Sequence, residues 1–319
     1  MIARGIRNLQ MKKPISVSFE ITHACTANCW HCNLGGQVKE ERLPPSGYAE
    51  ICRQLRPVVA HVSGGEPMVR NDVYDIVEAM ARVPGLAWLV MVSNGSLLTP
   101  EKFRRLKEAG IHQVTLSLDF PDERHDEFRR IPGLFQRLSR LVPELAQEFE
   151  RDDILMNVCI TSWNFREIPN IVRLAKEWGV GVNFSAFSHL RMEDRSGLIP
   201  PESREEFRRV MEEVIRLREG GHPVYNVPRI LWDYFRFLTG EAIPGCKAGL
   251  RFLVVNPDGR LTPCANVLAY FDSQEEMLRT FSEQNTCQEC YIATRSTTEC
   301  TVGEFLRDNA WVFTRWFRA

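Results

Sequence analysis

The chain has 319 residues, of which 44% are hydrophobic and 25% charged, and this globular composition excludes a disordered or fibrous protein. A formal charge of −1 gives no electrostatic argument for a nucleic-acid partner. The opening MIARGIRNLQ lacks an apolar stretch of signal-peptide length, and the longest uncharged run, residues 83–100, is interrupted by proline and glycine. We therefore expect a cytoplasmic protein whose ten cysteines are reduced thiols, metal ligands or catalytic groups.

Apolar runs rich in β-branched residues alternate with helical patterns through the first 190 residues. The runs begin near Ile15, Val58, Trp88, Gln113, Ile154 and Gly181. The helical patterns between them occupy residues 45–55, 71–83, 99–110, 132–149 and 164–179. Several have Asn, Ser or Thr at the start and Gly at the end, as helix caps do. About six alternations predict parallel βα units, fewer than the eight of a closed barrel. The predicted fold class is α/β, with a partial (β/α)6 barrel.

The pattern changes after residue 199. Residues 200–220 indicate a long, charged amphipathic helix, and residues 230–240 form an aromatic stretch. Two short apolar segments then flank Asn-Pro-Asp-Gly within residues 252–264, which is a strong hairpin signal. We expect a barrel domain over residues 1–235 and a second domain, a β-hairpin plus helices, over residues 236–319.

The segment THACTANCWHC places Cys25, Cys29 and Cys32 directly after the first strand. One interpretation is a helix face of small buried side chains, since free cysteine is commonly buried. Polar neighbours at the carboxyl end of a strand, where parallel α/β folds place their chemistry, favour a ligand site instead. Three thiolates suit zinc or an iron–sulfur cluster, and three protein ligands leave one metal position for a substrate or cofactor.

The spacing CxxxCxxC after the first strand resembles the signature of the radical S-adenosylmethionine (radical SAM) superfamily. The resemblance implies a [4Fe–4S] cluster on Cys25, Cys29 and Cys32, whose fourth iron is chelated by the amino and carboxylate groups of SAM. It also implies reductive cleavage of SAM to a 5′-deoxyadenosyl radical that abstracts hydrogen from a substrate. The family usually carries an aromatic residue just before the third cysteine, facing adenine. Here that residue is His31, whose imidazole can also stack.

The stretch SGGEP, residues 63–67, closes the second strand. Its two glycines allow close backbone approach by a ligand, and Glu66 supplies an acceptor for an ammonium group. Taken alone, the stretch could also be a tight strand-to-helix turn. It resembles the superfamily's GGE motif, which binds the SAM amino group, and this resemblance makes Ser63, Gly64, Gly65 and Glu66 candidate SAM-binding residues.

Further motifs follow in the order of the superfamily. SNG ends the third strand, LSLD ends the fourth, and HDEFRR comes next. By this resemblance Asn94 is a SAM-side residue, Ser117 is a candidate for the ribose or methionine moiety, and Arg129 contacts the SAM carboxylate. The looser match NVCITSWN adds Asn157 and Thr161. Each motif alone could be turn chemistry or a solvated face, and it is their joint order that favours the resemblance.

A second cysteine set lies in the last quarter of the chain. Cys246 and Cys264 are separated by seventeen residues, with Gly259 five residues before Cys264, and Cys287 and Cys290 form a CxxC. The predicted hairpin would bring the first two thiols together. This arrangement resembles the SPASM/twitch extension of radical SAM enzymes, which binds auxiliary clusters. A zinc site with four cysteine ligands is the structural alternative.

The second set departs from a complete SPASM region. After CxxC that region continues with two more cysteines, at positions that are Ser296 and Cys300 here, and no cysteine follows. We therefore expect one auxiliary [4Fe–4S] cluster. The twitch pattern implies that Cys246, Cys264, Cys287 and Cys290 hold it, and we prefer this set. Superposition on SPASM would instead make Cys300 a ligand. If it is spare, Cys300 is a hydrogen donor, a proton donor or an inert thiol.

The resemblance implies a biosynthetic oxidoreductase. An auxiliary cluster commonly accepts the electron left on a substrate radical, so we expect net dehydrogenation, decarboxylation or crosslinking. An external one-electron reductant of the flavodoxin or ferredoxin type is implied as a partner. About fourteen residues precede the first strand, too few for the leader-binding domain of many peptide-modifying relatives. This favours a small metabolite, a tetrapyrrole or a lipid-like substrate.

Three alternatives remain open. A redox-neutral rearrangement or epimerisation could use Cys300 to return a hydrogen atom, and the substrate could be a short peptide. The chain could also be a non-catalytic metal-binding scaffold. The tail EFLRDNAWVFTRWFRA sets aromatic residues among arginines and is expected to pack over the core or the auxiliary site, with membrane contact or a substrate wall as the alternatives. Buried packing is the expectation for Cys52 and Cys159.

Overall fold

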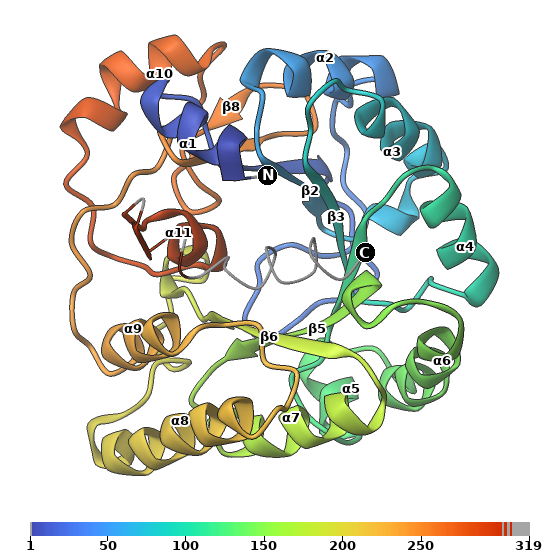
Figure 1. Cartoon of the computed structure of the whole chain (residues 1–319), viewed down its shortest axis with the longest axis vertical. Helices are drawn as coiled ribbons and strands as arrows, with labels where there is room; N and C mark the ends of the chain where they lie inside the picture. The colour runs from blue at the N-terminus through green and yellow to red at the C-terminus, as the bar shows by residue number, and fades with distance from the viewer. Residues whose placement is uncertain (1, 302, 305–306, 308–319) are drawn as a thin grey trace.

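A curved sheet of parallel strands, extended by one hairpin, organises the molecule (Figure 1). The computed structural model describes residues 2–301, 303, 304 and 307. Its strands are β1 (Ser16–Thr22), β2 (Val59–Gly64), β3 (Trp88–Ser93), β4 (Gln113–Ser117), β5 (Ile154–Ile160), β6 (Gly181–Ala186), β7 (Phe252–Val255) and β8 (Leu261–Thr262). They lie in the order β6-β5-β4-β3-β2-β1-β7-β8. β1 to β6 are parallel neighbours, which confirms the predicted α/β fold with a partial barrel.

The helices lie around the strands, most of them on the outside of the barrel (Figure 1). They are α1 (Ile2–Gln10), α2 (Pro45–Leu55), α3 (Val73–Ala81), α4 (Pro100–Glu108), α5 (Arg124–Arg129), α6 (Leu134–Glu148), α7 (Ile168–Glu177), α8 (Arg204–Glu219), α9 (Pro228–Leu238), α10 (Gln274–Thr280) and α11 (Ala293–Thr298). Pro45, Pro100 and Pro228 open their helices, at the position where a missing N–H removes no helical hydrogen bond. Thr99 caps α4 by accepting from the Lys102 N–H. Local sequence thus sets several helix starts.

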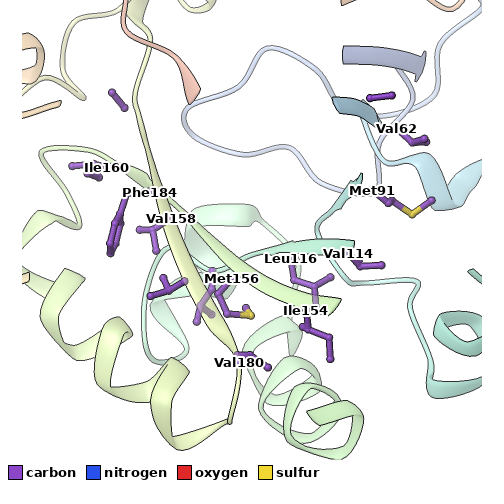
Figure 2. Close-up of a cluster of buried hydrophobic side chains, with 14 of the residues drawn as sticks. Val62, Met91, Val114, Leu116, Ile154, Met156, Val158, Ile160, Val180 and Phe184 are labelled. Carbon is purple, nitrogen blue, oxygen red and sulfur yellow. The ribbon is translucent and has the colours of Figure 1, made fainter. Parts of the chain in front are cut away.

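The outer face of the strands is apolar and packs beneath the helices. Val62, Met91, Leu116 and Met156 come from four successive strands and belong to one buried cluster (Figure 2). Because side chains alternate across a strand, every second residue faces this layer. The main core therefore lies between the sheet and its helices.

The inner face of the strands carries polar side chains, named here the inner wall: Ser18, His61, Ser117, Asn157 and Asn183. Ser18 pairs with His61 across β1 and β2, and Ser117 pairs with Asn157 across β4 and β5. Asn157 in turn pairs with Asn183 of β6. Since paired residues of neighbouring strands share a face, these side chains line the inside of the barrel as hydrogen-bonding groups.

The predicted hairpin is present and continues the barrel sheet. β7 pairs in parallel with β1, from Ser16 opposite Phe252 to Phe19 opposite Val255, and β8 returns antiparallel to β7. α11 contacts both β6, at one edge of the sheet, and β7, which lies next to the other edge strand, β8. The sheet thus crosses the predicted domain boundary at residue 235, and this boundary stays a prediction.

Two further expectations concern the membrane and the tail. Within the described part of the chain, no helix combines the length and the hydropathy needed to cross a bilayer. The aromatic residues of the tail, from Phe305 onward, lie outside the described residues. The predictions made for the tail therefore stay predictions.

Replacing Leu116 by alanine should destabilise the protein by about 2–5 kcal/mol, because Leu116 is fully buried in the outer layer and its truncation leaves a cavity. Urea unfolding of the anaerobically purified protein measures the change. Leu268, which is 78% exposed, provides the control, and its replacement by alanine should change stability by less than about 0.5 kcal/mol. Equal losses in the two variants would contradict the described core.

Candidate active site

The first cysteine set lies in the loop that follows β1. The Cys25 N–H donates to the Gly36 carbonyl at 3.0 Å, and the Cys32 N–H donates to the Cys29 carbonyl at 3.2 Å, so the loop folds back on itself. Burial, with smaller contributions from Glu66, Cys29 and Cys32, raises the pKa of the Cys25 thiol to about 11. Burial also raises the pKa of Cys29. The three thiols are therefore electrostatic neighbours that bind metal only with loss of their protons.

Two polar side chains direct N–H groups at the sulfurs. Asn94, after β3, donates from Nδ2 to Cys25 Sγ at 3.8 Å and to Thr26 Oγ1 at 3.0 Å. Arg129, at the end of α5, donates from Nη1 to Cys29 Sγ at 3.7 Å. Donors to sulfur stabilise thiolate and tune iron–sulfur clusters. The donor chemistry of this loop, three soft thiols with N–H partners, fits a cluster.

Asp119, after β4, fixes Arg129. Its Oδ2 accepts from Arg129 Nε at 2.6 Å, and its Oδ1 accepts from the Cys159 N–H at 3.0 Å. Burial opposes ionisation, but the guanidinium of Arg129 holds the pKa of Asp119 below its usual value. Within the described chain the Nη2 of Arg129 has no hydrogen-bond partner. That group is a donor available to a ligand carboxylate, as the predicted role of Arg129 requires.

The glycines of SGGEP are required by the chain itself. Gly64 has a φ of +120°, and a Cβ there would lie 2.1 Å from the Thr22 carbonyl oxygen. A Cβ on Gly65 would lie 2.2 Å from the Ala24 carbonyl oxygen. From the sequence, these glycines were expected to let a ligand approach the backbone closely. In the structure, the start of the cysteine loop lies against them. The turn after β2 and the cysteine loop are thereby held in direct backbone contact.

Glu66 connects that turn to the end of β3. Its fully buried carboxylate accepts from the Met68 N–H at 3.1 Å, from Ser93 Oγ at 2.9 Å and from the Asn94 N–H at 2.8 Å. Burial raises the pKa of Glu66, and these donors partly offset the rise. An ionised carboxylate offers about four acceptor positions, so one remains beyond these three bonds. Glu66 positions Asn94, and its contact with a SAM ammonium group stays a prediction.

The other predicted SAM-side residues have different surroundings. His31 stacks on Phe128 with ring centroids 5.0 Å apart, and burial lowers its pKa to about 4, which keeps the imidazole neutral. Ser63 Oγ is hydrogen-bonded to Ser18 Oγ at 2.7 Å. Fully buried Thr161 donates its hydroxyl to Asn164 Oδ1 at 3.0 Å, a local turn bond.

Ser117 and Asn157 both belong to the inner wall. Ser117 lies at the end of β4, opposite Asn157 in the strand pairing. Asn157 Nδ2 donates to Ser185 Oγ at 3.4 Å. Both residues are thus placed inside the barrel, where their predicted roles would require them to be.

Sequence reasoning did not identify two residues that hold the site together. Asp119 was visible as the acid that ends LSLD, ten residues before Arg129. Glu40 gave no signal, yet its carboxylate accepts from Thr22 Oγ1 at 2.5 Å, from the His23 N–H at 2.8 Å and from Arg42 Nε at 2.7 Å. It closes the cysteine loop onto the end of β1.

The second cysteine set gathers beside β7. Cys246 and Cys264 are buried against Phe252, with Cys287 at the edge of the same cluster. Burial, followed by the charges of Cys290 and Cys246, raises the pKa of Cys264 to about 12. Burial also raises the pKa of Cys290 to about 11, with Cys246 and Cys287 among its electrostatic neighbours. The four thiols of the preferred set are therefore neighbours.

The loops of this set lie against the end of β6. Asn266 Nδ2 donates to Ser188 Oγ at 3.0 Å, and Glu289 of the CxxC lies 3.8 Å from His189 Nε2. Cys300 interacts with Arg251 and lines a cavity of about 400 Å³ with Tyr291 and Glu299. Across the described residues, no three His, Cys, Asp or Glu side chains converge as ligands of a single metal ion.

Replacing Gly64 by alanine should displace the cysteine loop and remove most of the iron bound by Cys25, Cys29 and Cys32. The cause is the clash with Thr22, together with strain at φ +120° that costs more than about 1 kcal/mol. Iron and sulfide analysis measures the loss. Gly133→Ala is the matched control, because Gly133 also has a positive φ, +73°, but has open space around the added Cβ. Equal iron content in the two variants would refute the proposed contact.

Comparisons with known proteins agree with this geometry. Residues 19–175, about half of the chain, match the Radical SAM superfamily. The chain is 31% identical over 191 residues to the AdoMet-dependent heme synthase of Nitratidesulfovibrio vulgaris, an alignment that covers 56% of this chain and 49% of that protein. It is 28% identical over 261 residues to the PqqA peptide cyclase of Gluconobacter oxydans, covering 79% and 70%.

Solved structures show the same fold. Streptococcus suis SuiB bound to S-adenosylmethionine gives a TM-score of 0.66 at 14% identity, covering 89% of this chain and 70% of that one. Native anSMEcpe with bound AdoMet gives a TM-score of 0.65 at 15% identity, covering 96% and 99%. With the superfamily match over residues 19–175 and the thiol loop at its expected place, the barrel of this chain is identified as a radical SAM domain, and the cofactors of that superfamily are SAM and a [4Fe–4S] cluster.

Proposed function

We propose that this radical SAM enzyme carries out a net oxidation and uses one auxiliary [4Fe–4S] cluster bound by Cys246, Cys264, Cys287 and Cys290. The observation that carries the proposal is the gathering of these four thiols beside β7, with their loops against the end of β6. Four cysteine ligands complete a [4Fe–4S] cluster, whereas the three of the first set leave one iron for SAM. The two sets thus suit different roles.

The chain's own residues would hold and orient the bound cofactors. When bound, SAM and its cluster supply one-electron cleavage and the removal of hydrogen from carbon. Asp119 holds Arg129 in place for the SAM carboxylate, and Glu66 holds Asn94 beside Cys25. Because Asp119 and Glu66 are buried, they hold Arg129 and Asn94 in position before a ligand binds.

Electron bookkeeping favours oxidation. A flavodoxin- or ferredoxin-type partner supplies one electron for SAM cleavage, and removal of hydrogen leaves an unpaired electron on the substrate. A second cluster, held by Cys246, Cys264, Cys287 and Cys290, would supply an acceptor for that electron, and loss of the electron from the substrate would make the outcome a dehydrogenation, a decarboxylation or a crosslink. We further propose a cytoplasmic location, where reducing conditions keep the thiols available as ligands.

For the substrate, we propose a small metabolite, a tetrapyrrole or a lipid-like molecule bound inside the barrel. The inner wall offers hydrogen-bonding groups such as His61, Asn157 and Asn183. Similarity to a protein named heme synthase supports a tetrapyrrole. A peptide substrate is the second candidate, favoured by similarity to the PqqA peptide cyclase and by the fold shared with SuiB, which was also solved with the precursor peptide SuiA.

The auxiliary ligand set predicts a difference between two cysteines. The anaerobically reconstituted parent should hold about eight irons per chain, and Cys287→Ser should hold about four, because it loses a ligand of the second cluster. Cys300→Ser is the matched control and should keep about eight. Iron and sulfide analysis with visible absorption measures the difference. Loss of iron in Cys300→Ser with retention in Cys287→Ser would show that Cys300, and not Cys287, is a ligand. Zinc at the second site would exclude the auxiliary cluster.

The reaction itself is tested by release of 5′-deoxyadenosine from SAM under reducing conditions. We expect release by the parent and at least about tenfold less from Cys25→Ala/Cys29→Ala/Cys32→Ala, which lacks the SAM-binding cluster. A protein-free small-molecule extract should stimulate release. Stimulation only by a peptide fraction, abolished by protease treatment of that fraction, would instead establish the peptide alternative.

A further inference from the structure

Arg295 of α11 is a fully buried arginine at the second cysteine set. Its Nε donates to Glu299 Oε2 at 2.8 Å, and its Nη1 donates to the Cys290 carbonyl. Its Nη2 donates to the carbonyls of Ile243 at 2.6 Å and Pro244 at 3.1 Å. A buried guanidinium is tolerated only when it is bonded this fully, so the surroundings of Arg295 are specific for arginine.

The bonds of Arg295 hold the segments that carry the thiols. Pro244 stands two residues before Cys246, and Cys290 is itself one of the four thiol residues. Glu299, the ion-pair partner of Arg295, also accepts from the N–H of Lys247, the residue after Cys246. The pair therefore fixes the backbone on both sides of Cys246 and at Cys290.

The charge of Arg295 also reaches the thiols. The Arg295 guanidinium donates to the Cys290 carbonyl and to the carbonyl of Pro244, two residues before Cys246, so a buried positive charge lies beside both residues. Reduction of a bound cluster adds negative charge, and a buried cation nearby favours the more negative state. Glu299, which accepts from the N–H of Lys247 next to Cys246, brings a negative charge to the same segment, so the two side chains offset each other.

We propose that Arg295 positions and tunes the auxiliary cluster, holding the backbone at Cys246 and Cys290 and raising the reduction potential of the cluster so that it accepts an electron from the substrate. Glu299 lowers that potential and limits the increase. This inference rests on the proposed auxiliary cluster, and it adds a function that neither residue's sequence context indicated.

The test isolates the auxiliary cluster in the Cys25→Ala/Cys29→Ala/Cys32→Ala background and measures its potential by redox titration monitored by EPR. Arg295→Gln removes the cation and should shift the potential to more negative values. Glu299→Gln removes the anion and should shift it to more positive values. Arg295→Lys keeps the charge and should stay closer to the background than Arg295→Gln does. If Arg295 and Glu299 had purely structural roles, their replacements would not shift the reduction potential in opposite directions.

Arg70→Gln provides the control. Arg70 is also buried and donates to the carbonyls of Ile21 and Leu43, so its loss should destabilise the barrel without changing the potential. If Arg295→Gln assembles no cluster, Glu299→Gln and Arg295→Lys decide the question. An unshifted potential in Glu299→Gln, with the cluster present, overturns this inference alone. Absence of a cluster in the background protein removes the auxiliary cluster, and this inference with it.

Discussion

The arrangement of the loops at the carboxyl ends of the first strands depends on one backbone contact. The turn after β2 lies so close to the start of the cysteine loop that side chains at Gly64 and Gly65 would overlap the carbonyls of Thr22 and Ala24. The Gly65 and Glu66 N–H groups donate to those same carbonyls at 2.8 and 2.9 Å. From there the carboxylate of Glu66 reaches Asn94, whose amide contacts Cys25. Three separate motifs are therefore parts of one hydrogen-bonded unit.

β1 is the strand to which both cysteine sets are connected. It has β2, with its glycine turn, on one side and β7 of the hairpin on the other. The first set follows β1 directly, and the second set surrounds the hairpin that pairs with it. A continuous sheet therefore fixes the positions of the two cysteine sets relative to each other. An electron acceptor separate from the SAM site would require such a fixed arrangement. At the far edge, contacts of Ser188 and His189 hold the second set near β6.

Much of the barrel could be predicted because its signals are local. The six parallel strands begin within one residue of the predicted starts, and the pattern at 45–55 coincides with α2. α11, ATRSTT, is poor in helix-forming residues and is held by burial of Arg295, so no local pattern predicts it. α10 did have a signal, since Ser273 caps it by accepting from the Glu276 N–H.

The residues of the site likewise divide into those with a local sequence signal and those without one. Cysteine spacing and glycines are visible in the sequence because they recur in motifs, and the structure gathers the four preferred thiols of the second set. Asp119, Glu40 and Arg295 each bind at least one partner that is 10 to 52 residues away, and only the folded chain brings these pairs together. The sequence also could not show what lies against the glycines of SGGEP, because a ligand and a loop that approach the backbone closely both require glycine.

The most direct measurement is the EPR spectrum of the reduced, anaerobic protein with and without SAM. We expect two cluster signals, and we expect SAM to change only the signal that depends on Cys25, Cys29 and Cys32. The signal that depends on Cys246, Cys264, Cys287 and Cys290 should be unchanged, because four thiolates leave no iron free for SAM. A single signal, or a change on adding SAM in the signal of the second set, would contradict an enzyme with one open and one closed cluster.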